Sequence, residues 1–319
     1  MHINSKIFIA GASGLVGSAI YRKLKKEGYT NLLSPGHSEL DLTDQRAVSD
    51  YFVKKRPQYM FMAAAKVGGI LANNTYPADF IYQNLAIQNT LIHQARLQNV
   101  EKAIFLGSSC IYPKLCPQPM KEEHLLTGPL EPTNEPYAIA KIAGIEMCWA
   151  YNRQHGTRFI PVMPTNLFGP NDNFDLETSH VMAALIRKFH EAKQNGESAV
   201  NVWGTGSPKR EFLHVDDLAD ACVFLMNQPD TAIDYKNRPL FNIGTGEDLT
   251  IKSLAELIKE IVGYGGEIAF DTSRPDGTPR KLLDVSKMAN LGWRAQIGLK
   301  EGIRNTYGWF LENPNHVIG

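Results

Sequence analysis

Short apolar runs alternate with longer amphipathic segments along the first half of the chain. The apolar runs predict strands, and the amphipathic segments between them predict helices. The strands are expected at residues 6–10, 32–34, 59–63, 103–107 and 158–163, and the helices at 15–26, 43–55, 77–98 and 136–155. Since each gap is long enough for a crossover helix, the pattern predicts an α/β fold with a doubly wound parallel sheet.

The alternation loosens after Pro164, where turn-rich runs follow at 168–173 and 203–208. This half is typical of a smaller α/β cap domain that binds a substrate. The segments 212–226 and 240–243 return to regular patterns that could rejoin the first sheet. We therefore expect a cofactor-binding domain over residues 1–170, joined by part of 212–245, and a substrate-binding domain made of 171–211 and 246–319.

Composition narrows the class of partner. The 319 residues include 33 basic and 33 acidic side chains, and this balance favours a small polar ligand over nucleic acid or a membrane surface. The four cysteines lack the close spacing of a metal or redox site, so we expect no metal and a reducing, cytoplasmic setting. No apolar stretch is long enough for a signal peptide or a membrane span, which predicts a soluble protein.

A glycine-rich turn directly follows the first predicted strand and opens a helix. It comprises Gly11, Ala12, Ser13, Gly14, Leu15, Val16 and Gly17. Glycines there let backbone N–H groups and the helix N-terminus approach a pyrophosphate, as in Rossmann-type dinucleotide sites. A glycine turn that binds nothing is the alternative, and the strand before it and the helix after it disfavour that interpretation.

The end of the second strand indicates which dinucleotide binds. An acidic residue there would accept the ribose 2′-hydroxyl of NAD, and residues 34–38 contain none. Ser13, His37 and Ser38 could instead donate to a 2′-phosphate, so we expect NADP, used as NADPH. Asp41 follows closely and suits either a contact beneath the adenine or a helix cap.

Tyr137 and Lys141 are spaced so that both side chains lie on one helical face. A phenol with a reference pKa near ~10 needs a nearby cation to release its proton at neutral pH, and Lys141 is placed to supply one. Ser108 ends the fourth strand, where ligands of doubly wound folds bind. These residues predict a proton donor and a polarising hydroxyl for reducing a carbonyl.

Together these residues resemble the extended short-chain dehydrogenase/reductase family of nucleotide-sugar enzymes, nearly end to end. The runs 63–70, 73–77, 107–113, 131–137 and 208–214 are similar to those of members that convert GDP-4-keto-6-deoxy-D-mannose to GDP-L-fucose. The resemblance implies a bifunctional enzyme that epimerises C3 and C5 and then reduces the C4 ketone with NADPH. It also implies a homodimer formed through the helices at 77–98 and 136–155.

Cys110 and His180 occupy the positions that the resemblance assigns to epimerisation. Both carbons flank the C4 carbonyl, which acidifies them, and inversion needs two groups of suitable pKa on opposite faces. Reference pKa values of about 8.5 and about 6.5 would let a thiolate act as base and an imidazolium as acid. From the residues alone, a buried structural cysteine and a helix-start histidine are equally good interpretations.

The remaining contacts are expected at strand ends and in the cap. Cations suit a nucleoside diphosphate and an indole packs on a ring, so we expect substrate binding by Lys188, Trp203, Arg210, Asp276 and Lys281. Further cofactor contacts are expected at Glu39, Leu40, Asp41, Leu42, Leu106, Gly107, Ser108, Ser109, Lys141, Pro164, Thr165, Asn166, Leu167 and His180.

Other functions remain open at this point. The nearest is another nucleotide-sugar 4-reductase, 4-epimerase or dehydratase of the same family, although a dehydratase would carry an acid near the thiol of Cys110. A non-catalytic dinucleotide sensor is a further alternative, and the intact Tyr137 and Lys141 pair disfavours it. Some family members carry arginines where this chain has Ser13 and His37, which weakens the expectation of NADP without restoring NAD.

Overall fold

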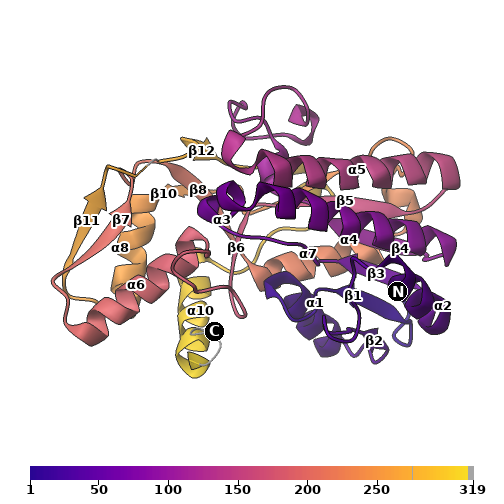
Figure 1. Cartoon of the computed structure of the whole chain (residues 1–319), viewed down its shortest axis with the longest axis horizontal. Helices are drawn as coiled ribbons and strands as arrows, with labels where there is room; N and C mark the ends of the chain where they lie inside the picture. The colour runs from indigo at the N-terminus through magenta and orange to yellow at the C-terminus, as the bar shows by residue number, and fades with distance from the viewer. Residues whose placement is uncertain (275, 315–319) are drawn as a thin grey trace.

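The computed structural model describes residues 1–274 and 276–314. Its main feature is a six-stranded parallel sheet in the order β2-β1-β3-β4-β5-β9 (Figure 1). The strands are β1 (Ile7–Ala10), β2 (Leu32–Leu33), β3 (Tyr59–Met62), β4 (Lys102–Leu106), β5 (Phe159–Pro164) and β9 (Phe241–Ile243). The strand order reverses between β1 and β3, and ligands of doubly wound folds bind beyond the carboxyl ends of the strands at such a reversal.

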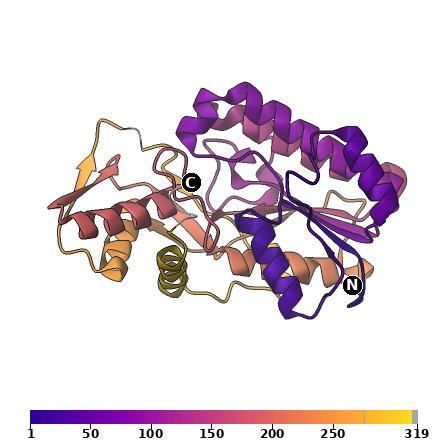
Figure 2. The same cartoon turned by 60° about the horizontal axis from the view of Figure 1, so that its bottom comes forward.

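Helices cover both faces of this sheet (Figures 1 and 2). One face carries α2 (Gln45–Lys55), α4 (Pro77–Leu97) and α5 (Glu135–His155), and the other carries α1 (Leu15–Lys26), α7 (Val215–Asn227) and α9 (Ser286–Asn290). Successive strand residues pack against opposite helix layers. Phe105 packs on the side of α2, α4 and α5, and Ile104 packs on the side of α1, α7 and α9. Because both faces are buried, the strands are mostly apolar, with Lys102 in β4 and Asn242 in β9 as polar exceptions.

A second region lies beyond the carboxyl edge of the sheet, at the left of Figure 1. It contains a four-stranded sheet of β6, β8, β10 and β12, and a parallel pair of β7 and β11. Its elements are β6 (Asn166–Phe168), α6 (Val181–Asn195), β7 (Ala199–Trp203), β8 (Lys209–His214), β10 (Asp248–Thr250), α8 (Ile251–Val262), β11 (Glu267–Asp271), β12 (Arg280–Lys281) and α10 (Leu299–Glu312). Apolar side chains of α6, α8 and α10 form a separate core there.

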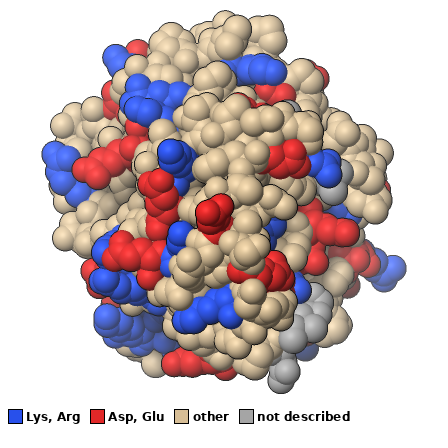
Figure 3. All heavy atoms as spheres, turned by 90° about the vertical axis from the view of Figure 1, so that its left-hand side faces the viewer, with Lys and Arg blue, Asp and Glu red and all other residues tan. Residues whose placement is uncertain are grey.

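Acidic and basic side chains are mixed over the outer face of this second region (Figure 3). Among the described residues, no helix has the length and apolar character needed to cross a membrane. The same residues contain no group of three His, Cys, Asp or Glu side chains arranged to hold a metal ion.

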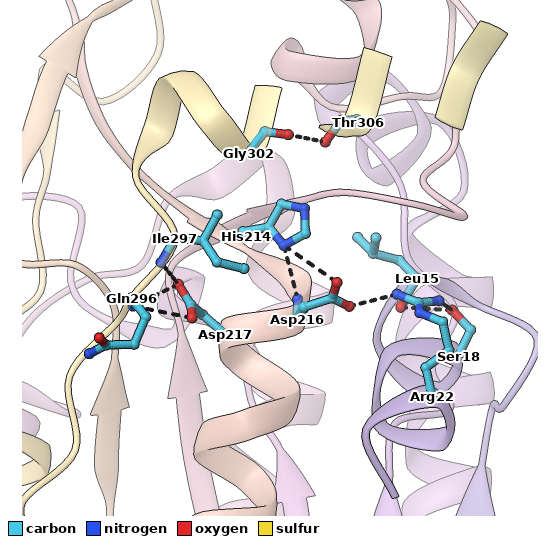
Figure 4. A network of polar contacts seen from close by, with 10 residues as sticks. All are labelled: Leu15, Ser18, Arg22, His214, Asp216, Asp217, Gln296, Ile297, Gly302 and Thr306. Carbon is cyan, nitrogen blue, oxygen red and sulfur yellow. Dashed lines mark hydrogen bonds and ion pairs between the residues drawn. The ribbon is translucent and has the colours of Figure 1, made fainter. Parts of the chain in front are cut away.

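Polar contacts connect the two regions through the end of β8 (Figure 4). Arg22 of α1 pairs with Asp216 at the start of α7, and Asp217 accepts from the backbone N–H groups of Gln296 and Ile297. His214 caps α7 by accepting from the N–H of Asp216. The C-terminal end of β8 is therefore held on both sides.

Several sequence predictions need correction. The helix expected from Thr43 begins at Gln45, because Asp44 is the residue whose carboxylate accepts from the first free N–H groups. The fifth strand ends at Pro164, and Asn166 begins β6. Of the segments expected to rejoin the first sheet, β9 adds a strand to it and α7 packs on one of its faces, whereas residues 212–214 finish β8 in the second sheet. No helix was expected at α3 (Ile70–Thr75).

Candidate active site

The glycine turn between β1 and α1 leaves backbone donors open. Gly14 is the N-cap of α1 and contributes no side-chain acceptor, so the first N–H groups of the helix stay available to an anion. A Cβ at Gly17 would lie 2.0 Å from the carbonyl oxygen of Gly11, and Gly11 itself has φ +78°. The turn therefore requires glycine at both positions, because any side chain would push the strand and the helix apart.

The segment after β2 is where the adenosine half of a dinucleotide would lie. His37 and Ser38 are exposed there, and Ser13 is exposed in the glycine turn. Asp41 accepts from the N–H and the hydroxyl of Thr43, so it forms a local turn and does not cap the helix. These positions can offer donors to a phosphate, and residues 34–38 place no carboxylate against it.

The ends of β4 and β5 carry the next group of predicted residues. Leu106 ends β4 and is followed by Gly107 to Ser109, and Ser108 begins a short turn by accepting from the N–H of Cys110 at 3.4 Å. Pro164 ends β5, Thr165 follows it, and Asn166 and Leu167 begin β6. Because β4 and β5 are parallel neighbours in the same parallel sheet as β1, the carboxyl ends of all three strands lie at one edge of the sheet.

Lys141 reaches the same edge from α5. Its Nζ donates to the carbonyl oxygen of Leu106 at 2.8 Å and lies 5.8 Å from the ring centroid of Tyr137. Burial lowers the pKa of Lys141 to about 8. Burial also raises the pKa of Tyr137, although the Ser108 side chain opposes this shift. Desolvation of the phenol thus opposes the lowering of its pKa that the sequence led us to expect.

Cys110 and His180 show the same effect of burial. Cys110 is buried, which raises the pKa of its thiol, although Lys281 and Lys141 oppose the rise. His180 keeps an exposed surface as the N-cap of α6, yet the protein around it, together with Lys281, lowers the pKa of its ring. Both shifts favour the uncharged forms, a thiol for Cys110 and a neutral imidazole for His180.

Lys281 connects this group to the cap. It pairs in register with Arg210 across β12 and β8, and its charge acts on Cys110, His180 and Arg210. Burial lowers the pKa of both cations, because desolvation disfavours their charged forms. A bound anion would stabilise those charged forms. Lys281, with Arg210 beside it in register, thus lies within electrostatic reach of Cys110.

Lys188, Trp203 and Asp276 lie farther along the cap. Lys188 lies over the indole of Trp203 at 5.3 Å, and Arg274, which the sequence did not single out, lies at 5.0 Å from the same ring. Half of Trp203 is exposed, so the indole can pack on a ligand. Both carboxylate oxygens of Asp276 accept from Thr205, so the structure assigns it to holding a loop.

The reversal of strand order, the glycine turn and the Tyr/Lys pair define a Rossmann-type nucleotide-binding protein. The chain belongs to the NAD dependent epimerase/dehydratase family, whose sequence pattern matches residues 7–244.

Individual relatives are similar over almost the whole chain. GDP-L-fucose synthase 1 of Arabidopsis thaliana is 59% identical over 310 residues, covering 97% of this chain and 94% of that protein. GDP-L-fucose synthase of Escherichia coli (strain K12) is 54% identical over 317 residues, covering 98% and 99%. The structure of a GDP-L-fucose synthetase from Naegleria fowleri bound to NADP is 31% identical, with a TM-score of 0.91 and coverage of 100% and 96%.

Proposed function

We propose that this protein converts GDP-4-keto-6-deoxy-D-mannose to GDP-L-fucose by epimerising C3 and C5 and then reducing the C4 ketone with NADPH. The observation that carries the proposal is the group at the end of β4. There Ser108 and Cys110 lie with Tyr137, Lys141 and Lys281. The chain is similar to GDP-L-fucose synthases over 97% to 98% of its length.

Epimerisation uses the acidity that the C4 carbonyl gives its neighbours. One of Cys110 and His180 removes the proton from C3, negative charge develops on the C4 oxygen, and the other group returns a proton on the opposite face. The same exchange takes place at C5. Ser108 and Tyr137 stabilise the oxyanion in both cases, since each can donate a hydrogen bond to it.

Reduction uses the same oxygen. NADPH supplies the hydride that adds to C4. Tyr137 donates its proton to the oxygen as the alkoxide forms, and the Lys141 ammonium stabilises the phenolate left behind. The donors at the start of α1 fit the pyrophosphate, and Ser13, His37 and Ser38 fit the 2′-phosphate. On this proposal the six-stranded region binds NADPH, and the second region binds the GDP part through Arg210, Lys281, Lys188 and Trp203.

We also propose a cytoplasmic homodimer. Large apolar side chains of α4 and α5 are exposed in the single chain, including Tyr82 at 71% and Ile139 at 42%, and a partner would cover them. The four cysteines are unpaired, which suits a reducing compartment. Light scattering on the purified protein would measure its mass, and a monomer at micromolar concentration would contradict the dimer.

The decisive experiment supplies GDP-4-keto-6-deoxy-D-mannose and NADPH and identifies the sugar formed by NMR. We expect GDP-L-fucose with one NADPH oxidised per sugar. A reduced sugar with C3 and C5 uninverted would make the protein a simple 4-reductase and refute the epimerase half.

A further inference from the structure

Glu211 is a buried carboxylate for which the proposed reaction has no use. It lies in β8 directly after Arg210 and has no exposed surface. Ionised groups are rarely buried this completely, because loss of water costs free energy unless hydrogen bonds replace it. Since alternate side chains of a strand point to opposite faces, Arg210 and Glu211 lie on opposite sides of β8.

The carboxylate of Glu211 joins two separate segments. Oε1 accepts from the N–H of Gly246 at 2.8 Å and lies 3.5 Å from the hydroxyl of Thr245. Oε2 accepts from the N–H of Leu283 at 2.9 Å. Gly246 follows β9 of the six-stranded sheet, and Leu283 lies two residues after Lys281. One side chain therefore connects the end of the first sheet to the strand that carries a substrate-side cation.

The backbone of Glu211 makes a third connection. Its carbonyl oxygen accepts from Nδ2 of Asn166 at 2.8 Å and from the hydroxyl of Thr165 at 3.3 Å, and both residues follow β5. The space around the Glu211 carboxylate is closely filled, since a Cβ at Gly244 would lie 2.2 Å from Oε1 of Glu211. The far end of β8 is already held by Asp216 and Asp217 (Figure 4), so Glu211 restrains the end of the strand that bears Arg210.

We propose that Glu211 is a positioning residue, which sets Arg210 and Lys281 at a fixed place relative to the cofactor-binding sheet. The carboxylate form is required because both oxygens face backbone N–H groups, and only a carboxylate offers an acceptor on each side. A glutamine would turn its NH₂ group toward one of these donors. The register of β12 on β8, and with it the spacing of the two cations, would then relax.

This inference rests on the proposed function for its ligand, so the test measures binding to each region separately. In Glu211→Gln we expect the affinity for GDP, measured by calorimetry, to fall about 10- to 100-fold, as for the loss of a charged buried hydrogen bond. The affinity for NADPH should stay within about twofold. Amide hydrogen exchange should become faster in peptides that contain Leu283 and Gly246.

The control is Glu247→Gln, which removes the same charge from an exposed position one residue beyond Gly246 and should bind both ligands as the unaltered protein does. Unchanged GDP affinity in Glu211→Gln, or a parallel loss of NADPH affinity, would overturn the positioning role. If Glu211→Gln does not fold, Thr245→Val tests the same carboxylate, with an expected fall in GDP affinity of about two- to fivefold and equal binding contradicting the role.

Failure of the proposed function has a different signature. An unaltered protein that binds no GDP would refute the nucleotide-sugar assignment. The exchange of the Leu283 and Gly246 amides would still decide whether Glu211 holds the two segments together.

Discussion

The ammonium of Lys141 lies over the ring of Tyr137, with Nζ 5.8 Å from the ring centroid. The same Nζ donates to the carbonyl oxygen of Leu106, so the cation is held by the last residue of β4. The phenol and its cation are therefore fixed to the strand end that carries Ser108 and Cys110.

Replacing Tyr137 by phenylalanine should separate the two halves of the reaction. We expect ketone reduction to slow about 100- to 10,000-fold, because the proton donor is lost. Exchange of the substrate C3 and C5 protons with heavy water should continue at a measurable rate. Tyr151→Phe, on the same helix, is the matched control, and full reduction by Tyr137→Phe would refute the assignment.

The charge of Lys141 should limit reduction at high pH. Because burial lowers the pKa of Lys141 to about 8, the ammonium is present below that pH and is lost above it. The kcat/KM for reduction should fall as the pH rises through about 8. Lys141→Met should be slower at all pH values and should lack this fall, and an unaltered profile in the variant would contradict the role.

Cys110→Ser should abolish C3 and C5 proton exchange, since a hydroxyl ionises far less readily than a thiol, while some ketone reduction remains. NMR in heavy water would follow the exchange. Cys116→Ser is the control, because Cys116 contacts His124 and lies outside the proposed site. Normal exchange in Cys110→Ser would show that another group moves the proton.

Epimerisation should have a broad pH optimum. Burial raises the pKa of Cys110 from 9.0 and lowers the pKa of His180 from 6.5, so between these limits the pair holds one proton. The pair holds this one proton either on Cys110, as a thiol beside a neutral imidazole, or on His180, as an imidazolium beside a thiolate. Exchange should fall below the lower limit as His180 gains a proton, and above the upper limit as Cys110 loses one. An optimum confined between pH 6.5 and 9.0 would contradict these directions.

The dinucleotide preference should depend on the segment after β2. We expect NADPH to be turned over faster than NADH, and His37→Asp to reduce kcat/KM for NADPH about tenfold by placing a carboxylate near the 2′-phosphate. The value for NADH should change little. Steady-state rates with both cofactors measure this, and equal or better turnover with NADH by the unaltered protein would refute the preference.

Local patterns predicted much of the six-stranded region. The predicted helix from Leu15 to Lys26 agrees with α1 at both ends, and the strand predicted from Tyr59 agrees with β3 to within one residue. Hydrophobic periodicity and glycine turns are local signals that depend on only a few residues. The cap was predicted less well. Its short strands β6, β10 and β12 are stabilised by pairing with β8, and such partners are remote in sequence.

The sequence by itself determined the glycine turn, the strand-end Ser108 and the spacing of Tyr137 and Lys141, because each depends on neighbours within one turn or one strand. Only the tertiary structure decided that Lys281 acts on both Cys110 and His180 and that Glu211 is buried between two segments. The directions of the pKa shifts also belong to the tertiary structure. Desolvation depends on every segment packed around a group, and no local pattern records it.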